Sequence, residues 1–170
     1  MSAVQNNIVL VNEADYRFTL QPCLVTSGGV ATIQAGTPTK AYDATGASWT
    51  GAIIPMVDGD GTTSQRFTGI CKSTSTDTAS ANGVATVWLP LPGLVYASKS
   101  KDLTSANTAA KVQALFGKRV VYDLTSSLWS VDAAASDAAA NMVTIIGGDF
   151  NTSTLYFTYK QTGTVIGQIA

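Results

Sequence analysis

Histidine is absent from this 170-residue chain, and charge of either sign is scarce. Without histidine, neither a Ser-His-Asp nor a Cys-His nucleophile arrangement can form, and no metal site can use imidazole ligands. Charged residues make up 12% of the chain, which is about half of the usual share. Ten basic and eleven acidic residues give a formal net charge of -1. This balance lacks the basic patch with which proteins bind nucleic acid or an anionic membrane.

Long apolar runs are also missing. No stretch approaches the roughly 20 apolar residues that span a bilayer. Residues 1–7 contain no basic residue, and the apolar run 8–11 that follows is too short for a signal peptide. We therefore expect synthesis in a host cytoplasm and no membrane partner. The two cysteines, Cys23 and Cys71, are too far apart for a metal knuckle, and they form either two buried thiols, which we favour, or one disulfide.

Threonine and serine take the place of the missing charge, and 45% of the residues are hydrophobic. Short apolar or alternating runs are separated by turn residues, which is typical of an all-β barrel or sandwich. Pro55 restricts its run to an edge strand or a bulge. In the run 154–160, Leu155, Phe157 and Tyr159 share one face. We predict strands over residues 16–20, 30–33, 52–57, 66–71, 84–89, 118–123, 142–146, 154–160 and 164–169.

One short α-helix is predicted near residues 105–116. Apolar residues recur there at helical spacing, cap candidates lie at 104–107, and Gly117 stands where a helix would stop. The alanine-rich segment 133–140 is either a second helix or a loop. The pattern Tyr-Asp-x-Thr-x-x-x-Trp occurs at 42–49 and again at 122–129. Each copy predicts a hairpin whose Trp packs near its Tyr, in two unrelated hairpins or in two duplicated half-domains.

The candidates for chemistry have simpler structural interpretations. The run 58–61, Asp-Gly-Asp-Gly, resembles a calcium loop but lacks the acidic residue at position twelve, so we interpret it as a turn. Cys71 has no histidine to activate it and lies in an apolar run. Trp49, Trp88 and Trp129 either stack on sugar rings or belong to the core. We predict no enzyme activity, no metal and no cofactor.

The segment Leu89-Pro90-Leu91-Pro92-Gly93 is the most unusual stretch. Its two prolines remove two backbone donors, so it cannot continue as a central strand. It is expected to leave the strand 84–89 as an extended edge or crossover. Such a segment is either tucked under a loop or offered to a partner, to which its preset conformation would bind at a lower entropy cost.

Together with this segment, residues 66–70 (RFTGI), 82–84 (NGV), 87–96 (VWLPLPGLVY) and 118–124 (KRVVYDL) resemble the capsid decoration (cement, head-stabilising) proteins of tailed bacteriophages. The resemblance covers a minor part of the chain, and its motifs mark strands and turns. It implies a β-tulip-like barrel or sandwich and a homo-oligomer, most often a trimer. It also implies a place on the exterior of the virion, where such proteins bind neighbouring major capsid protein subunits and hold them against internal DNA pressure.

We accordingly expect an extended N-terminal arm over residues 1–15 and a single β-rich domain over 16–170. The residues expected to contact the capsid are Ile8, Val9, Leu10, Val11, Leu91, Pro92 and Leu94. Deletion of residues 1–11 is expected to abolish capsid binding and to leave the fold intact. The alternative function is a carbohydrate-binding head-fibre or tail-associated adhesin that uses Trp49 or Trp129. A major coat or scaffold protein fits a chain this short and weakly charged less well.

Overall fold

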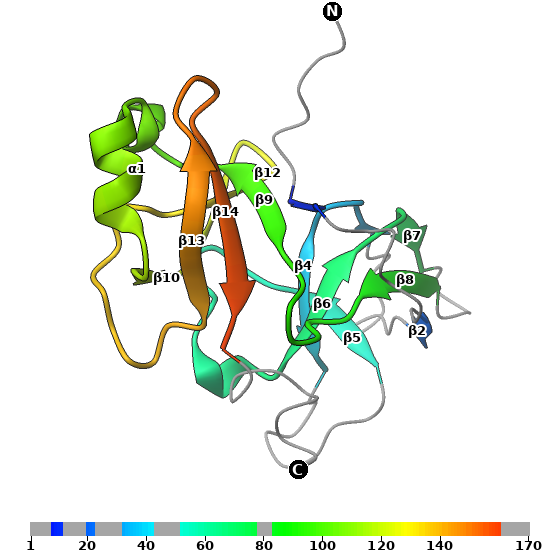
Figure 1. Cartoon of the computed structure of the whole chain (residues 1–170). Coiled ribbons are helices and arrows are strands. Elements are labelled where there is room, and N and C mark those ends of the chain that lie inside the picture. Colours follow the sequence, from blue (N-terminus) through cyan, green and yellow to red (C-terminus); the bar gives the residue numbers. More distant parts are fainter. Residues whose placement is uncertain (1–7, 12–19, 23–31, 43–51, 78–82, 161–170) are drawn as a thin grey trace, which may run out of the picture.

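The structure is a computed structural model, and it describes residues 8–11, 20–22, 32–42, 52–77 and 83–160. Over this part of the chain the fold is mostly β, with several antiparallel sheets, one of them curled as a half-barrel, and one short α-helix (Figure 1). The predicted all-β class with a single short helix is confirmed.

Two five-stranded antiparallel sheets form the framework. The first sheet has the order β1 (Val9–Leu10), β9 (Tyr96–Lys99), β14 (Thr154–Tyr159), β13 (Val143–Asp149), β10 (Arg119–Val120). The second sheet has the order β2 (Leu20–Pro22), β8 (Val84–Trp88), β6 (Phe67–Cys71), β4 (Pro38–Ala41), β5 (Ile53–Pro55). Two smaller ladders pair β11 (Tyr122–Thr125) with β12 (Leu128–Val131) and β3 (Thr32–Ile33) with β7 (Ser75–Thr76).

The β13–β14 hairpin carries the centre of the first sheet. Leu155, Phe157 and Tyr159 are buried, while the residues between them are half-buried. This confirms the predicted shared face, because successive side chains of a strand point to opposite sides. The three residues join a large hydrophobic cluster rich in aromatic rings, which we call the ring cluster. Its aromatic members are Phe67, Trp88, Tyr96, Tyr122, Trp129, Phe157 and Tyr159.

The second sheet encloses a smaller aliphatic cluster, made of Ile33, Ile53, Cys71, Ala85 and Val87. Every residue of β6 is buried, and this strand reaches both clusters. Gly69 has a φ of 147°, and a Cβ there would collide with the backbone carbonyl of Trp88. Only glycine therefore fits this position. Pro55 ends β5 at the edge of the sheet, as predicted.

The predicted helix corresponds to a 3-10 turn, η3 (Leu103–Ala106), followed by α1 (Ala109–Leu115). Thr108 caps α1 through its hydroxyl, which accepts a hydrogen bond from the Lys111 amide at 3.3 Å. Gly117 follows the helix at a φ of 81°, in the left-handed region that glycine tolerates. Val112 and Leu115 are buried in the ring cluster. In Figure 1, α1 lies beside β13.

The segment 133–140 is not helical. The carboxylate of Asp132 accepts hydrogen bonds from the amides of Ala134 and Ala135, at 2.9 and 3.1 Å, and holds a turn there instead. The predicted strand 118–123 divides in two, because Arg119 pairs with β13 whereas Tyr122 pairs with β12. The 3-10 turn η2 (Thr63–Gln65), together with β4 and β9, was not predicted from the sequence. The strand predicted at 164–169 and most of the one at 16–20 lie outside the described residues.

Candidate functional site

The first segment expected to contact a capsid, residues 8–11, is part of the first sheet. Val9 lies opposite Ala97 and Leu10 opposite Tyr96, and the amide of Val11 donates to the carbonyl of Val95 at 2.8 Å. Alternation along this strand buries Ile8 and Leu10 in the ring cluster. Val9 and Val11 face outward, with 43% and 53% of their surface exposed. Among the described strands, β1 is the edge of its sheet.

The second expected contact segment, residues 91–94, is a tight turn between β8 and β9. The amide of Leu94 donates to the carbonyl of Leu91 at 3.3 Å, and Gly93 has a φ of 86°. Proline followed by such a glycine is typical of a type II turn. Pro92 is exposed at its tip, Leu91 is half-buried against the ring cluster, and Leu94 is buried.

Three of the seven expected contact residues, Ile8, Leu10 and Leu94, therefore belong to the core and offer no surface to a partner. Residues 8–11 of the predicted arm are a strand of the folded domain. Deletion of residues 1–11 would remove this edge strand and two buried side chains, contrary to the expectation that the fold stays intact. Val9, Val11 and Pro92 are the exposed members of the set.

The acidic run 58–61 is a turn, as predicted. The carboxylate of Asp60 accepts from the Lys40 ammonium and from the Val57 amide, both at 2.8 Å. Asp58 accepts from the amide of Leu124 at 3.0 Å, so the turn is attached to β11. In the described ranges, no three His, Cys, Asp or Glu side chains are grouped to hold a metal ion.

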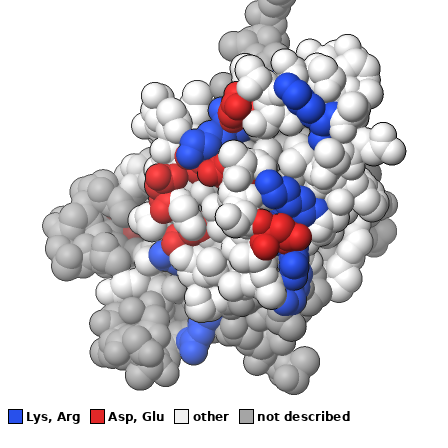
Figure 2. Space-filling view, turned by 90° about the vertical axis from the view of Figure 1, so that its left-hand side faces the viewer, with Lys and Arg blue, Asp and Glu red and all other residues white. Residues whose placement is uncertain are grey.

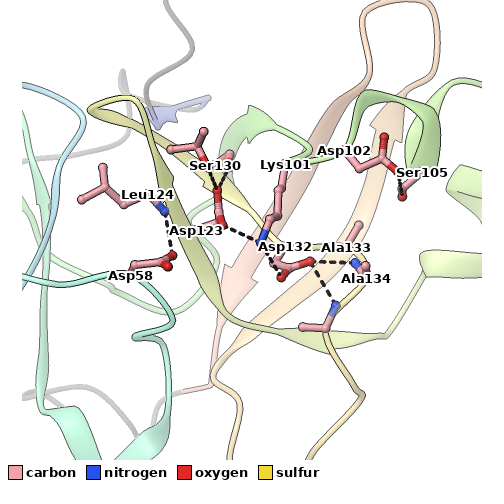
Figure 3. Close-up of polar contacts among 12 residues, drawn as sticks. Asp58, Lys101, Asp102, Ser105, Asp123, Leu124, Ser130, Asp132, Ala133 and Ala134 are labelled. Atoms are coloured by element: carbon pink, nitrogen blue, oxygen red, sulfur yellow. Dashed lines mark hydrogen bonds and ion pairs between the residues drawn. The ribbon is translucent and has the colours of Figure 1, made fainter.

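A second polar cluster joins the end of β9 to the β11–β12 hairpin (Figure 3). The ammonium of Lys101 lies 2.7 Å from Asp123 Oδ1 and 3.4 Å from Asp132 Oδ2. Burial raises the pKa of Asp123, but hydrogen bonds from Lys101 and Thr125 outweigh it and leave that pKa lowered. The hydrogen bond to Asp123 raises the pKa of Lys101. Both groups are therefore held in their charged forms at neutral pH and are poorly suited to proton transfer.

A pocket of about 280 Å³ opens beside this ion pair. One wall is formed by β9 and η3, and the other by the outward face of the β11–β12 hairpin. The register pairs Asp123 with Ser130 and Thr125 with Leu128, so these four side chains share one face. The sequence did not predict this pocket. The only available signal was the alternation of residues 122–125 and 128–131 around the predicted turn.

The pocket is lined by Lys99, Ser100, Lys101, Leu103, Asp123, Thr125, Ser126, Leu128 and Ser130.

The opposite face of the hairpin carries Trp129, which is only 4% exposed. Its ring meets Tyr122 edge-on, with centroids 6.1 Å apart. The predicted hairpin, with its Trp packed near its Tyr, is thus confirmed at 122–129. Trp88 is also buried in the ring cluster. Of the sequence copy at 42–49, residues 43–49 with Trp49 lie outside the described residues, as does Cys23. Cys71 is buried in β6.

Charges of both signs are interspersed on the face shown in Figure 2, where acidic and basic side chains adjoin one another. None of the helices in the described ranges is long and apolar enough to cross a membrane. No protein-family model, no curated protein and no solved structure matches the chain. Over the described residues, fold and site together define the class as a small, mostly β protein with an edge strand that exposes valines and a mixed polar–apolar pocket beside an ion pair.

Proposed function

We propose that this protein decorates the outside of a bacteriophage capsid and stabilises it by binding major capsid protein subunits, as a homo-oligomer, most simply a trimer. One observation carries the proposal. Two segments expected from the sequence to contact the capsid, residues 8–11 and 91–94, lie together at one edge of the first sheet, where the Val11 amide donates to the carbonyl of Val95, the residue after the second segment. There they expose Val9, Val11 and Pro92.

The physical properties of this edge suit a protein partner. An edge strand can pair with a strand of another chain, and neighbouring apolar side chains then set the register. The turn around Pro92 is fixed by its own hydrogen bond, so it loses little conformational entropy on binding. The formal net charge of -1 also permits many copies to lie close together on one surface with little mutual repulsion.

The direct test is quantitative mass spectrometry of purified particles from the culture that carries the gene. A copy number comparable to that of the major capsid protein is the expected result. A few copies per particle would instead indicate a fibre or tail component. Absence from the particles would overturn the proposal.

Variants of the exposed edge test the contact itself. Val9→Asp combined with Val11→Asp places two charges on the proposed contact and is expected to weaken co-sedimentation with expanded heads by at least about tenfold. Val84→Asp is the matched control, because Val84 is an exposed strand valine of the second sheet. Equal loss of binding in both variants would contradict the assignment of the edge, even if the copy number were high.

The adhesin alternative loses one of its two suggested aromatic platforms, because Trp129 is buried against Tyr122. The polar pocket on the other face of the same hairpin offers a different basis for ligand binding, which does not depend on tryptophan.

A further inference from the structure

We propose that the pocket between β9–η3 and the β11–β12 hairpin binds one neutral pyranose unit at the end of a glycan. The two walls come from separate segments, residues 99–103 and 123–130, and the Lys101–Asp123 ion pair at 2.7 Å ties them together (Figure 3). The pocket is therefore built by the fold and is not a gap beside a single loop.

The size of the pocket suits one ring. Pockets for drug-sized ligands span about 300–1,000 Å³. A volume of about 280 Å³ lies just below that range, so it suits one sugar ring better than a longer ligand.

The charges of the lining favour a neutral ligand. Lys101 is paired with Asp123 and Asp132. The ammonium of Lys99 donates to the carbonyl of Thr152 and, at 3.2 Å, to the hydroxyl of Thr154. An anionic ligand would compete with two carboxylates for Lys101, whose charge they already neutralise, and would have to draw the Lys99 ammonium away from its carbonyl and hydroxyl partners. A neutral ligand leaves the pairs in place and uses the hydrogen-bonding capacity that remains.

That remaining capacity has both donors and acceptors. Lys101 has three ammonium hydrogens and two carboxylate partners. The Thr125 hydroxyl donates to Asp123 at 2.7 Å and keeps its acceptor lone pairs. Ser100 is 2% exposed, and its Oγ has no hydrogen-bond partner within the described part of the chain. Vicinal sugar hydroxyls, each a donor and an acceptor, match this combination.

Two leucines complete an amphipathic lining. Leu103 and Leu128 both line the pocket and are 55% and 40% exposed, although large aliphatic side chains are usually buried. One leucine comes from η3 and the other from β12. A pyranose ring presents C–H groups as well as hydroxyls. Covering the leucines with those C–H groups would remove apolar surface from water at the same time as the polar groups are satisfied.

The test is an amide chemical-shift titration of the ¹⁵N-labelled full chain with methyl β-D-glucopyranoside, methyl β-D-galactopyranoside, methyl α-D-mannopyranoside and methyl N-acetyl-β-D-glucosaminide. At least one glycoside is expected to give saturable shifts at residues 99–103 and 123–130. Sodium glucuronate, a charged pyranose, is expected to bind more weakly. The proposal is overturned if no glycoside shifts these amides, if the shifts lie elsewhere, or if glucuronate binds more tightly.

Matched variants locate the site. Leu103→Ala with Leu128→Ala is expected to weaken binding about tenfold. The control is Phe116→Ala with Phe150→Ala, which also removes two exposed apolar side chains but does not touch the pocket lining. Thr125→Val removes a hydroxyl from the pocket lining and should weaken binding as well. Equal weakening by the control pair would contradict the assignment. Because the isolated chain is used, the outcome is independent of capsid binding.

Discussion

The ring cluster and the aliphatic cluster share one strand but differ in how they are filled. Phe67 and Ile70 of β6 pack into the ring cluster, while Cys71 of the same strand packs into the aliphatic cluster. The ring cluster joins the first sheet, α1 and the β11–β12 hairpin, whereas the aliphatic cluster has five buried side chains among the described residues. Since the stabilisation by apolar burial scales with the area removed from water, the ring cluster is expected to contribute more to stability than the described residues of the aliphatic cluster.

The two regions also satisfy their buried polar atoms differently. In the second sheet, the hydroxyl of Thr39 bonds with that of Thr68 at 2.8 Å and donates to the carbonyl of Gly69 at 2.9 Å. In the ring cluster, the phenol hydroxyls of Tyr122 and Tyr159 hydrogen-bond to each other. Burial raises the pKa of both phenols, so each stays neutral. Because the aliphatic cluster is the smaller of the two, we expect local opening to begin in the second sheet. Loss of the larger ring cluster is expected to unfold the chain.

The largest expected effect is that of Phe157→Ala. Phe157 is fully buried and meets Tyr159 edge-on, with centroids 5.7 Å apart. The variant should lower the free energy of unfolding by about 3–5 kcal/mol, through lost burial and the cavity that remains. Urea denaturation measures this loss. Phe116→Ala is the control, since Phe116 is 69% exposed and should change the value by no more than about 0.5 kcal/mol. Similar losses in both variants would contradict the assignment of this stability to burial in the ring cluster.

A smaller effect is expected at the polar boundary of the ring cluster. Asp123→Asn removes the charge that pairs with Lys101 and should lower stability at pH 7 by about 1–3 kcal/mol. The folded-state pKa of Asp123 lies below its ordinary value of 3.8. Its stabilisation is therefore present above that value and is lost as the pH falls through the lower folded-state pKa. The stabilities of wild type and variant, from urea melts, should converge in acid.

Asp137→Asn is the matched control for that experiment. Asp137 also forms an ion pair, with Arg119 at 2.8 Å, but both side chains are substantially exposed. Exposed pairs contribute little to stability, because water and salt screen them, so Asp137→Asn should cost less than Asp123→Asn. A larger loss from Asp137→Asn than from Asp123→Asn would contradict the importance given to burial.

The sequence predicted those parts of the fold that depend on local patterns. The alternation of Leu155, Phe157 and Tyr159 identified a buried face, and Pro55 identified an edge strand. The missed strands β4 and β9 contain Thr, Lys and Ser (PTKA and YASK), so neither has a long apolar run. The strands form because distant partners pair with them, such as β14 with β9. Such pairing overrides local propensity.

The candidate sites also depend on contacts between distant segments, which the sequence does not reveal. All four residues of the run 8–11 are apolar, so the sequence does not distinguish them. Once the strand pairs with β9, alternate residues face the core and the surface. The pocket depends on Lys101 and Asp123, which are 22 residues apart and are brought together by tertiary structure. No spacing rule connects them. Exposure and convergence of side chains are therefore properties of the folded chain.

The smallest expected effect on the free energy of unfolding comes from Ile→Val substitutions. They compare the two clusters most directly, because the same chemical change can be made in each. Ile53→Val in the aliphatic cluster and Ile145→Val in the ring cluster each remove one methylene from a fully buried side chain. Each should cost about 0.5–1.5 kcal/mol. Native-state hydrogen exchange should separate them. Ile53→Val should speed exchange in β4, β5 and β6 alone, whereas Ile145→Val should also speed exchange of the slowest amides, which open only on global unfolding. Identical patterns would mean that the two clusters unfold as one cooperative unit.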